Sequence, residues 1–271
     1  MLLLHGFPQF WWMWRYQLAA LAEHGYRAVA LDLRGFGASD KPPRGHDTWT
    51  ACDDAAAIVR SLGEEEAVIV GHGLGGWIAW STAYLHPSLC RGLVTLSMPH
   101  PRVMRRALFN PRQVFAGRFL AGMQTPFVPE REMIKRGYVR ERLWAAAGYA
   151  RDPLRGTPFP SPEEIRRYEL ALRQPFAADA IADHYRWLVR SQFRASGRRL
   201  AAALKGALPL DVLAMHGALD PVTLPSLMSA SATYVGGTFS AHLLPDVGHY
   251  VPEEVPDLTN RLLLSWLESQ P

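Results

Sequence analysis

The chain has 271 residues, which is enough for one large domain or two small ones. It is 48% hydrophobic and 20% charged with a net charge of +4, a composition that argues against disorder. No apolar run is long enough to span a membrane, the first residues do not resemble a secretory signal, and two cysteines are too few for a disulfide framework or a structural zinc site. We therefore expect a protein of the cytoplasm that uses neither a metal nor a cofactor.

The two ends of the chain alternate between strands and helices. Strands are predicted at 2–4, 26–33, 67–70, 92–96, 210–215 and 238–244, and helices at 11–23, 48–62, 75–85, 225–232 and 256–267, with Thr50 capping the second helix. This alternation is typical of a mostly parallel sheet with helices on both faces.

The middle of the chain interrupts that pattern. Ten prolines from Pro99 to Pro175 separate short helical stretches such as 131–147 and 162–173, and no strand is predicted there. Residues 101–205 hold 21 Lys and Arg against 9 Asp and Glu, whereas the other residues hold 8 against 16. We predict a doubly wound α/β core formed by residues 1–99 and 206–271, with a basic helical cap inserted at 100–205.

The strand at 67–70 runs through a glycine-rich turn into a helix. Gly71, Gly73 and Gly76 have the spacing of a dinucleotide-binding turn, but such a turn needs an acidic residue about 20 positions later. No Asp or Glu occurs between Ala67 and Phe127, which argues against a dinucleotide. The second interpretation is a nucleophile elbow, G-x-nucleophile-x-G, in which Gly73 holds the nucleophile position without a side chain.

Four other motifs accompany this turn in order along the chain. They are His5-Gly6-Phe7-Pro8, residues 32–42 (DLRGFGASDKP), residues 217–222 (GALDPV) and residues 247–253 (VGHYVPE). Together with the turn they resemble the α/β-hydrolase superfamily, specifically its epoxide hydrolase-like branch, over nearly the whole chain. The resemblance implies an α/β-hydrolase fold. Typical members carry further strands before the His-Gly loop, so we expect N-terminal strands to be missing, either through a misassigned start or in a shortened variant.

The motifs near the end of the chain supply a candidate acid and base. Asp220 and His249 follow successive predicted strands, so the carboxylate can orient the imidazole and the imidazole can activate water. The resemblance also implies that the backbone N–H groups of Phe7 and Leu74 form an oxyanion hole. A helix beginning at Gly75 would add positive potential at that point.

The resemblance places the substrate in an apolar pocket between cap and core. Two cap tyrosines of this branch donate hydrogen bonds to the epoxide oxygen; Tyr185 matches one, and Phe119 stands where the other is expected. The remaining residues that we expect to line the pocket are His5, Pro8 and Trp77.

Gly73 is the main departure from the family pattern. Epoxide hydrolases of this branch place Asp at this position and esterases place Ser, so a covalent ester cannot form at Gly73. Ser97, Ser81 or Cys90 would have to reach both His249 and the oxyanion donors to replace it. Water activated by His249 is the more plausible route and would sustain weak hydrolysis.

Two functions remain open at this point. The first is hydrolysis of a small apolar epoxide or ester by water that His249 and Asp220 activate; the second is non-catalytic binding of a small molecule in a retained pocket. Residues 101–120 interleave five arginines with apolar residues, which fits either a cap helix packed on the core or peripheral contact with an anionic membrane. No motif predicts binding to nucleic acid, and nothing predicts the oligomeric state.

Overall fold

The structure, a computed structural model, describes residues 1–270 and contains within them one six-stranded sheet. The strand order is β2-β1-β3-β4-β5-β6, and every neighbouring pair is parallel. The bounds are β1 (Leu2–Leu4), β2 (Val29–Leu31), β3 (Ala67–His72), β4 (Cys90–Leu96), β5 (Val212–Gly217) and β6 (Phe239–Leu244). The predicted fold class is therefore confirmed, with a second strand shorter than expected.

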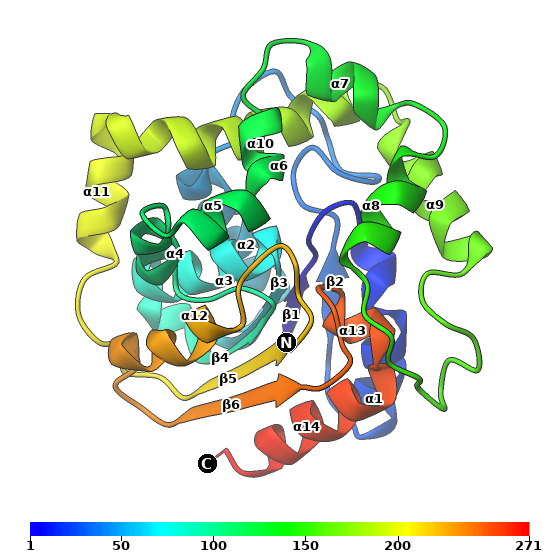
Figure 1. Ribbon diagram of the computed structural model, residues 1–271. Helices are drawn as coiled ribbons and strands as arrows, with labels where there is room; N and C mark the ends of the chain where they lie inside the picture. The colour runs from blue at the N-terminus through cyan, green and yellow to red at the C-terminus, as the bar shows by residue number, and fades with distance from the viewer. Residues whose placement is uncertain (271) are drawn as a thin grey trace.

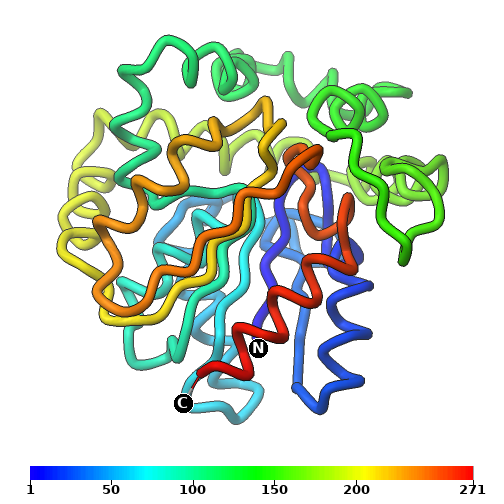
Figure 2. Tube along the Cα trace, turned by 60° about the horizontal axis from the view of Figure 1, so that its bottom comes forward, coloured from blue at the N-terminus to red at the C-terminus, as the bar shows by residue number. Residues whose placement is uncertain are grey.

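Helices cover both faces of this sheet, as a buried parallel sheet requires. Helices α1 (Arg15–Glu23) and α14 (Pro256–Glu268) lie side by side on one face, whereas α2 (Thr48–Ser61) and α3 (Leu74–Leu85) pack together on the other (Figure 1; Figure 2). Short helices η1 (Trp11–Trp14), η2 (Pro87–Leu89), α12 (Ser226–Ala230), η4 (Ser231–Tyr234) and α13 (Val251–Glu254) complete the core.

One predicted helix cap is wrong. The N-cap of α2 is Asp47 rather than Thr50, because the Asp47 carboxylate accepts hydrogen bonds from the backbone N–H and the hydroxyl of Thr50 at 3.1 and 2.9 Å. Both residue types can cap a helix, and only the position of the first helical turn decides between them.

All regular secondary structure between β4 and β5 is helical. Its helices are α4 (Pro101–Ala107), α5 (Pro111–Ala116), α6 (Arg118–Gly122), α7 (Val128–Met133), α8 (Tyr138–Ala146), α9 (Pro162–Leu172), α10 (Ala177–Arg190), η3 (Ser191–Phe193) and α11 (Ala195–Ala203). The predicted helix at 131–147 is in fact two helices, because Gly137 adopts a left-handed φ of +84° between them. Among all described helices, none is long and apolar enough to cross a bilayer.

A buried ionic cluster ties this helical cap to the core. Arg15 of α1 contacts both Glu253 of α13 and Glu164 of α9, at 2.8 Å from the former, and Arg155 pairs with Glu164 at 2.7 Å. Tyr168 of the cap donates its hydroxyl hydrogen to Glu253. Because buried charges are stable only when they are paired and hydrogen-bonded, this cluster fixes one side of the cap on the core.

Candidate active site

The turn between β3 and α3 has the geometry of a nucleophile elbow. Gly73 adopts φ +53° and ψ −118°, a conformation that side chains rarely adopt. A Cβ atom at Gly71 would collide with the backbone of Gly75, and one at Gly75 would collide with the carbonyl of Leu4. The glycines on either side of residue 73 therefore allow strand and helix to cross at close range.

Residue 73 itself faces the imidazole of His249. A Cβ atom built on Gly73 would lie 3.6 Å from His249 Nε2 and 3.7 Å from the Cα of Gly6, both ordinary contact distances. A side-chain atom at residue 73 would therefore fit in van der Waals contact with the imidazole nitrogen.

The acid and base candidates meet as expected from successive strands. His249 Nδ1 lies 2.8 Å from Asp220 Oδ2, and Asp220 Oδ1 accepts hydrogen bonds from the backbone N–H groups of Val222 and Thr223. Burial alone would raise the pKa of Asp220, but the neighbouring His249 and His216 outweigh it and lower this pKa below its ordinary value. An ionised Asp220 fixes the proton of His249 on Nδ1 and leaves Nε2 free to accept one.

Two further histidines support this pair, and the motifs alone did not identify them. His216, the penultimate residue of β5, lies with its Nε2 2.9 Å from the Thr223 carbonyl and 3.2 Å from Asp220 Oδ2. His72 Nε2 lies 2.8 Å from the carbonyl of His249, and burial lowers the pKa of His72 to about 3, so it is a neutral donor. The sequence feature that could have identified both histidines is their position at the carboxyl ends of β3 and β5.

The two predicted oxyanion donors are available. Among residues 1–270, neither the backbone N–H of Phe7 nor that of Leu74 has a hydrogen-bond partner, whereas that of Gly75 donates to His5 O at 3.1 Å. Helix α3 begins at Leu74, so its first N–H group points out of the helix end, where the helix dipole favours negative charge.

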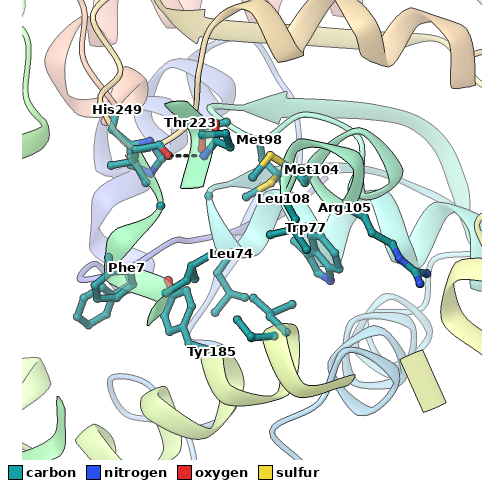
Figure 3. A pocket seen from close by; sticks show the side chains of 18 of the residues that line it. Phe7, Leu74, Trp77, Met98, Met104, Arg105, Leu108, Tyr185, Thr223 and His249 are labelled. Atoms are coloured by element: carbon teal, nitrogen blue, oxygen red, sulfur yellow. Dashed lines mark hydrogen bonds between the residues drawn. The ribbon is translucent and has the colours of Figure 1, made fainter. Parts of the chain in front are cut away.

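A cavity of about 140 Å³ joins the elbow to the cap. Its lining includes seven of the residues proposed for the site, which are Phe7, Gly73, Leu74, Trp77, Phe119, Tyr185 and His249 (Figure 3). A cavity of this order holds a molecule about the size of benzene. Because cap residues and elbow residues share it, the cap covers the carboxyl edge of the sheet.

The expectation that His5 and Pro8 line this cavity is wrong. Neither is among the described residues that line it. The His5 ring is fully buried beneath the loop, where Nε2 accepts a hydrogen bond from Leu33 N at 3.0 Å and Nδ1 lies 2.7 Å from Gly6 O. His5 therefore ties the loop at residues 5–8 to the segment that follows β2.

Tyr185 and Phe119 pack against each other in the wall of the cavity. Their ring centroids lie 5.0 Å apart in an edge-to-face arrangement. Burial raises the pKa of Tyr185, which keeps its hydroxyl protonated as a hydrogen-bond donor. Phe119 offers no hydroxyl, so this pair carries a single donor.

None of the three substitute nucleophiles lies beside His249 Nε2. The Ser97 hydroxyl donates to the carbonyl of His249 at 2.7 Å, and that of Ser81 donates to Trp77 O at 2.8 Å. Cys90 is buried, which raises the pKa of its thiol to about 12. No described member of this trio lines the cavity.

Comparison with known proteins places the chain in a family. Residues 1–256 match the family described as alpha/beta hydrolase fold, and the chain belongs to it. The AB hydrolase superfamily protein YfhM of Bacillus subtilis is 29% identical over 99% of this chain and 90% of its own length. Epoxide hydrolase 3 of Xenopus tropicalis is 30% identical over 99% of this chain and 71% of its own length.

Solved structures give the same result. An epoxide hydrolase from an endophytic Streptomyces superposes with a TM-score of 0.82 at 30% identity, covering 98% of this chain and 88% of the other. A Bacillus megaterium epoxide hydrolase superposes with a TM-score of 0.85 at 24% identity, covering 99% and 93%, and supports the fold alone. The chain is an epoxide hydrolase-like member of the α/β-hydrolase fold family.

Proposed function

We propose that the protein hydrolyses a small apolar epoxide or ester through a water molecule activated by His249. The observation that carries this proposal is the room for one further atom at Gly73 in the cavity wall, where a Cβ atom would lie in ordinary contact, 3.6 Å from His249 Nε2. Water placed in that space would be within reach of the base and of the substrate cavity at once. Relatives that are named epoxide hydrolases support the substrate class.

The proposed reaction is an addition of water to an epoxide. The water oxygen forms a bond to a ring carbon, the carbon–oxygen bond of the ring breaks, and His249 Nε2 accepts the water proton. The ring oxygen takes a proton from Tyr185, and exchange with solvent returns both side chains to their starting states. With an ester, the N–H groups of Phe7 and Leu74 would stabilise the tetrahedral oxyanion instead.

The rate should be modest. In a serine protease triad, loss of the nucleophile lowers turnover by about 10⁶, and the remaining oxyanion hole and binding contacts retain roughly 10³ to 10⁴ over water. Attack by water in a single step uses only those remaining contacts, so we expect a rate enhancement of about this residual size.

A panel of epoxides and esters tests this function. The native protein should give diol or acid products above the uncatalysed rate, and His249→Ala should abolish the difference. The matched control is His24→Ala, which removes an exposed imidazole on the surface of the core. Absence of turnover on the whole panel, together with identical traces for the native protein and His249→Ala, would refute the proposal.

A second candidate function is binding without chemistry. It is favoured by Gly73, because a protein that has lost its nucleophile keeps the cavity and the oxyanion donors as a binding site. Saturable capture of an epoxide that is recovered unchanged would support this function, and robust turnover would exclude it.

A further inference from the structure

Arg142 is a cation in the wall of a mainly apolar cavity. Its guanidinium carbon lies 4.1 Å from the centroid of the Phe119 ring, and its Nε is buried without a hydrogen-bond partner. Among the described residues, no carboxylate pairs with it. A partly buried cation whose one partner is an aromatic ring retains five N–H donors for a ligand.

The placement of Arg142 brings this cation close to the proposed reaction site. It lies on α8, one helical turn before Ala146, whose carbonyl accepts a hydrogen bond from the backbone N–H of His249 at 2.7 Å. Burial raises the pKa of Tyr185 and that of Tyr250, and the charge of Arg142 acts against both shifts. The Phe119 ring under the guanidinium packs edge-to-face on Tyr185 with centroids 5.0 Å apart, and the Tyr250 hydroxyl donates to the Arg142 carbonyl at 3.3 Å, so Arg142 lies beside both tyrosines.

Arg105 is the second cation that lines this cavity, and it has a different orientation. Figure 3 shows its side chain extending away from Phe7 and Tyr185. Arg142 is thus the cation that remains available to a molecule held beside His249.

We propose that the cavity takes a small amphipathic molecule whose carboxylate is held by Arg142. The planar guanidinium matches a carboxylate with two parallel hydrogen bonds, and burial strengthens such a pair. Phe7, Leu74 and Trp77 contact the apolar part of the molecule, which extends toward residue 73. This inference rests on the proposed function only for the nature of the reacting group; the carboxylate site itself is independent of turnover.

Binding of hexanoate and 1-hexanol at neutral pH tests the carboxylate site by calorimetry, with no chemical step involved. The two probes share their chain length and differ in charge. The native protein should bind hexanoate roughly ten- to hundredfold more tightly, because a hydrogen bond to a charged group contributes about that factor. Arg142→Gln should abolish the preference and leave binding of 1-hexanol unchanged.

The matched control is Arg140→Gln, which removes an exposed arginine from the same helix and should keep the preference. If Arg142→Gln unfolds, Arg142→Lys keeps the charge, loses the planar fork and should reduce the preference only in part. Equal affinities of the native protein for the two probes, or an undiminished preference in a folded Arg142→Gln, would overturn the proposal. Absence of turnover on the epoxide and ester panel would not contradict the carboxylate site, because the binding measurement involves no chemical step.

A second, independent observation concerns the surface of the cap. Thirteen of the sixteen large apolar side chains exposed in residues 1–270 belong to the cap. In α4, α5 and the turn between them, Leu108, Phe109, Val114 and Phe115 are exposed, with Phe109 at 91% and Phe115 at 70%. We call these four residues, together with Arg106, Arg112 and Arg118, the cap patch.

The charge around the cap patch is of one sign. Residues 101–129 contain five arginines and no Asp or Glu. Arg106 and Phe109 share a surface hollow with Arg198 and Lys205 of the neighbouring α11 segment. Leu108 also lines the substrate cavity, so the cap patch borders the route by which an apolar molecule would enter.

We propose that the cap patch rests on the surface of an anionic membrane. Exposed aromatic side chains bury apolar area at the headgroup boundary, and cations attract anionic headgroups. Charge of a single sign favours this occupant over a second copy of the chain, whose identical patch would repel it.

Co-sedimentation with vesicles tests this docking. The protein should bind vesicles of equal parts phosphatidylcholine and phosphatidylglycerol and bind pure phosphatidylcholine much more weakly. Phe109→Ser should weaken binding about tenfold, and the pair Arg106→Gln and Arg112→Gln by roughly fivefold for each charge removed.

The matched controls are Leu243→Ser on β6 and the pair Arg44→Gln and Arg60→Gln, which alter exposed residues of the core by the same chemistry. These controls should leave binding unchanged. Equal binding to both vesicles, equal losses in the controls, or a dimer that Phe109→Ser dissociates would each overturn the membrane proposal.

Discussion

Restoring a carboxylate at residue 73 is the most direct test of the site. In Gly73→Asp the new Cβ would lie 3.6 Å from His249 Nε2 and 3.7 Å from Gly6 Cα, so this atom meets no collision. Its carboxylate could then attack an epoxide carbon and form the ester that the native chain cannot form. His249, oriented by Asp220 at 2.8 Å, would activate the water that hydrolyses this ester.

Two opposing magnitudes follow from this geometry. A side chain at φ +53° and ψ −118° is strained, which lowers the free energy of unfolding by about 1–3 kcal/mol. For a chain of this size such a loss lowers the melting temperature by several degrees, so the variant should still fold. Loss of the nucleophile in a serine protease triad lowers turnover by about 10⁶, so even partial recovery in Gly73→Asp should raise epoxide turnover by at least roughly a hundredfold.

The assay compares the native protein, Gly73→Asp and Gly73→Ala on one epoxide panel. Gly73→Ala imposes the same backbone strain without a carboxylate and should show no gain. In the double variant Gly73→Asp and His249→Ala, the ester should accumulate and be visible as an added mass on the protein. A folded Gly73→Asp with unchanged turnover and no mass adduct would refute the argument that only the nucleophile is absent.

Three further predictions concern the supports of the site. Asp220→Asn should reduce any turnover by about 10² or more, since the amide favours the wrong tautomer of the imidazole; unchanged rates would contradict the pairing. Arg155→Met should lower the free energy of unfolding by about 3–5 kcal/mol in chemical denaturation, because it leaves the buried carboxylate of Glu164 with one cation fewer. Burial would raise the pKa of Glu164, but its hydrogen bond with Arg155 outweighs this and lowers it, so the native protein should lose stability as pH falls below about 4.5, and the variant should lose less. Gly75→Ala should severely destabilise the protein in thermal unfolding, whereas Gly122→Ala, which has open space around it, should change stability by less than about 0.5 kcal/mol.

Much of the fold follows from local sequence pattern. The apolar strands, the helices between them and the glycine turn at residue 73 were predicted because each depends on neighbours a few residues away. The pairing of Asp220 with His249 was also predictable, because successive parallel strands end at the same edge of a sheet.

Other features depend on which side chains meet across long separations in the chain. The sequence predicted His5 as a pocket residue, but the structure turns its ring under the loop toward Leu33. It likewise did not reveal that His216 supports Asp220, or that Arg142 lies over Phe119 without a carboxylate partner.

The sequence by itself therefore determined the architecture, the glycine turn and the pairing of Asp220 with His249. Tertiary structure alone decided which polar groups face the cavity and which are satisfied within the protein. The physical reason is that secondary structure arises from local backbone preferences and periodic burial. The direction of a side chain and the partner that it finds depend instead on packing between segments such as α8 and the loop before α13, which lie about a hundred residues apart.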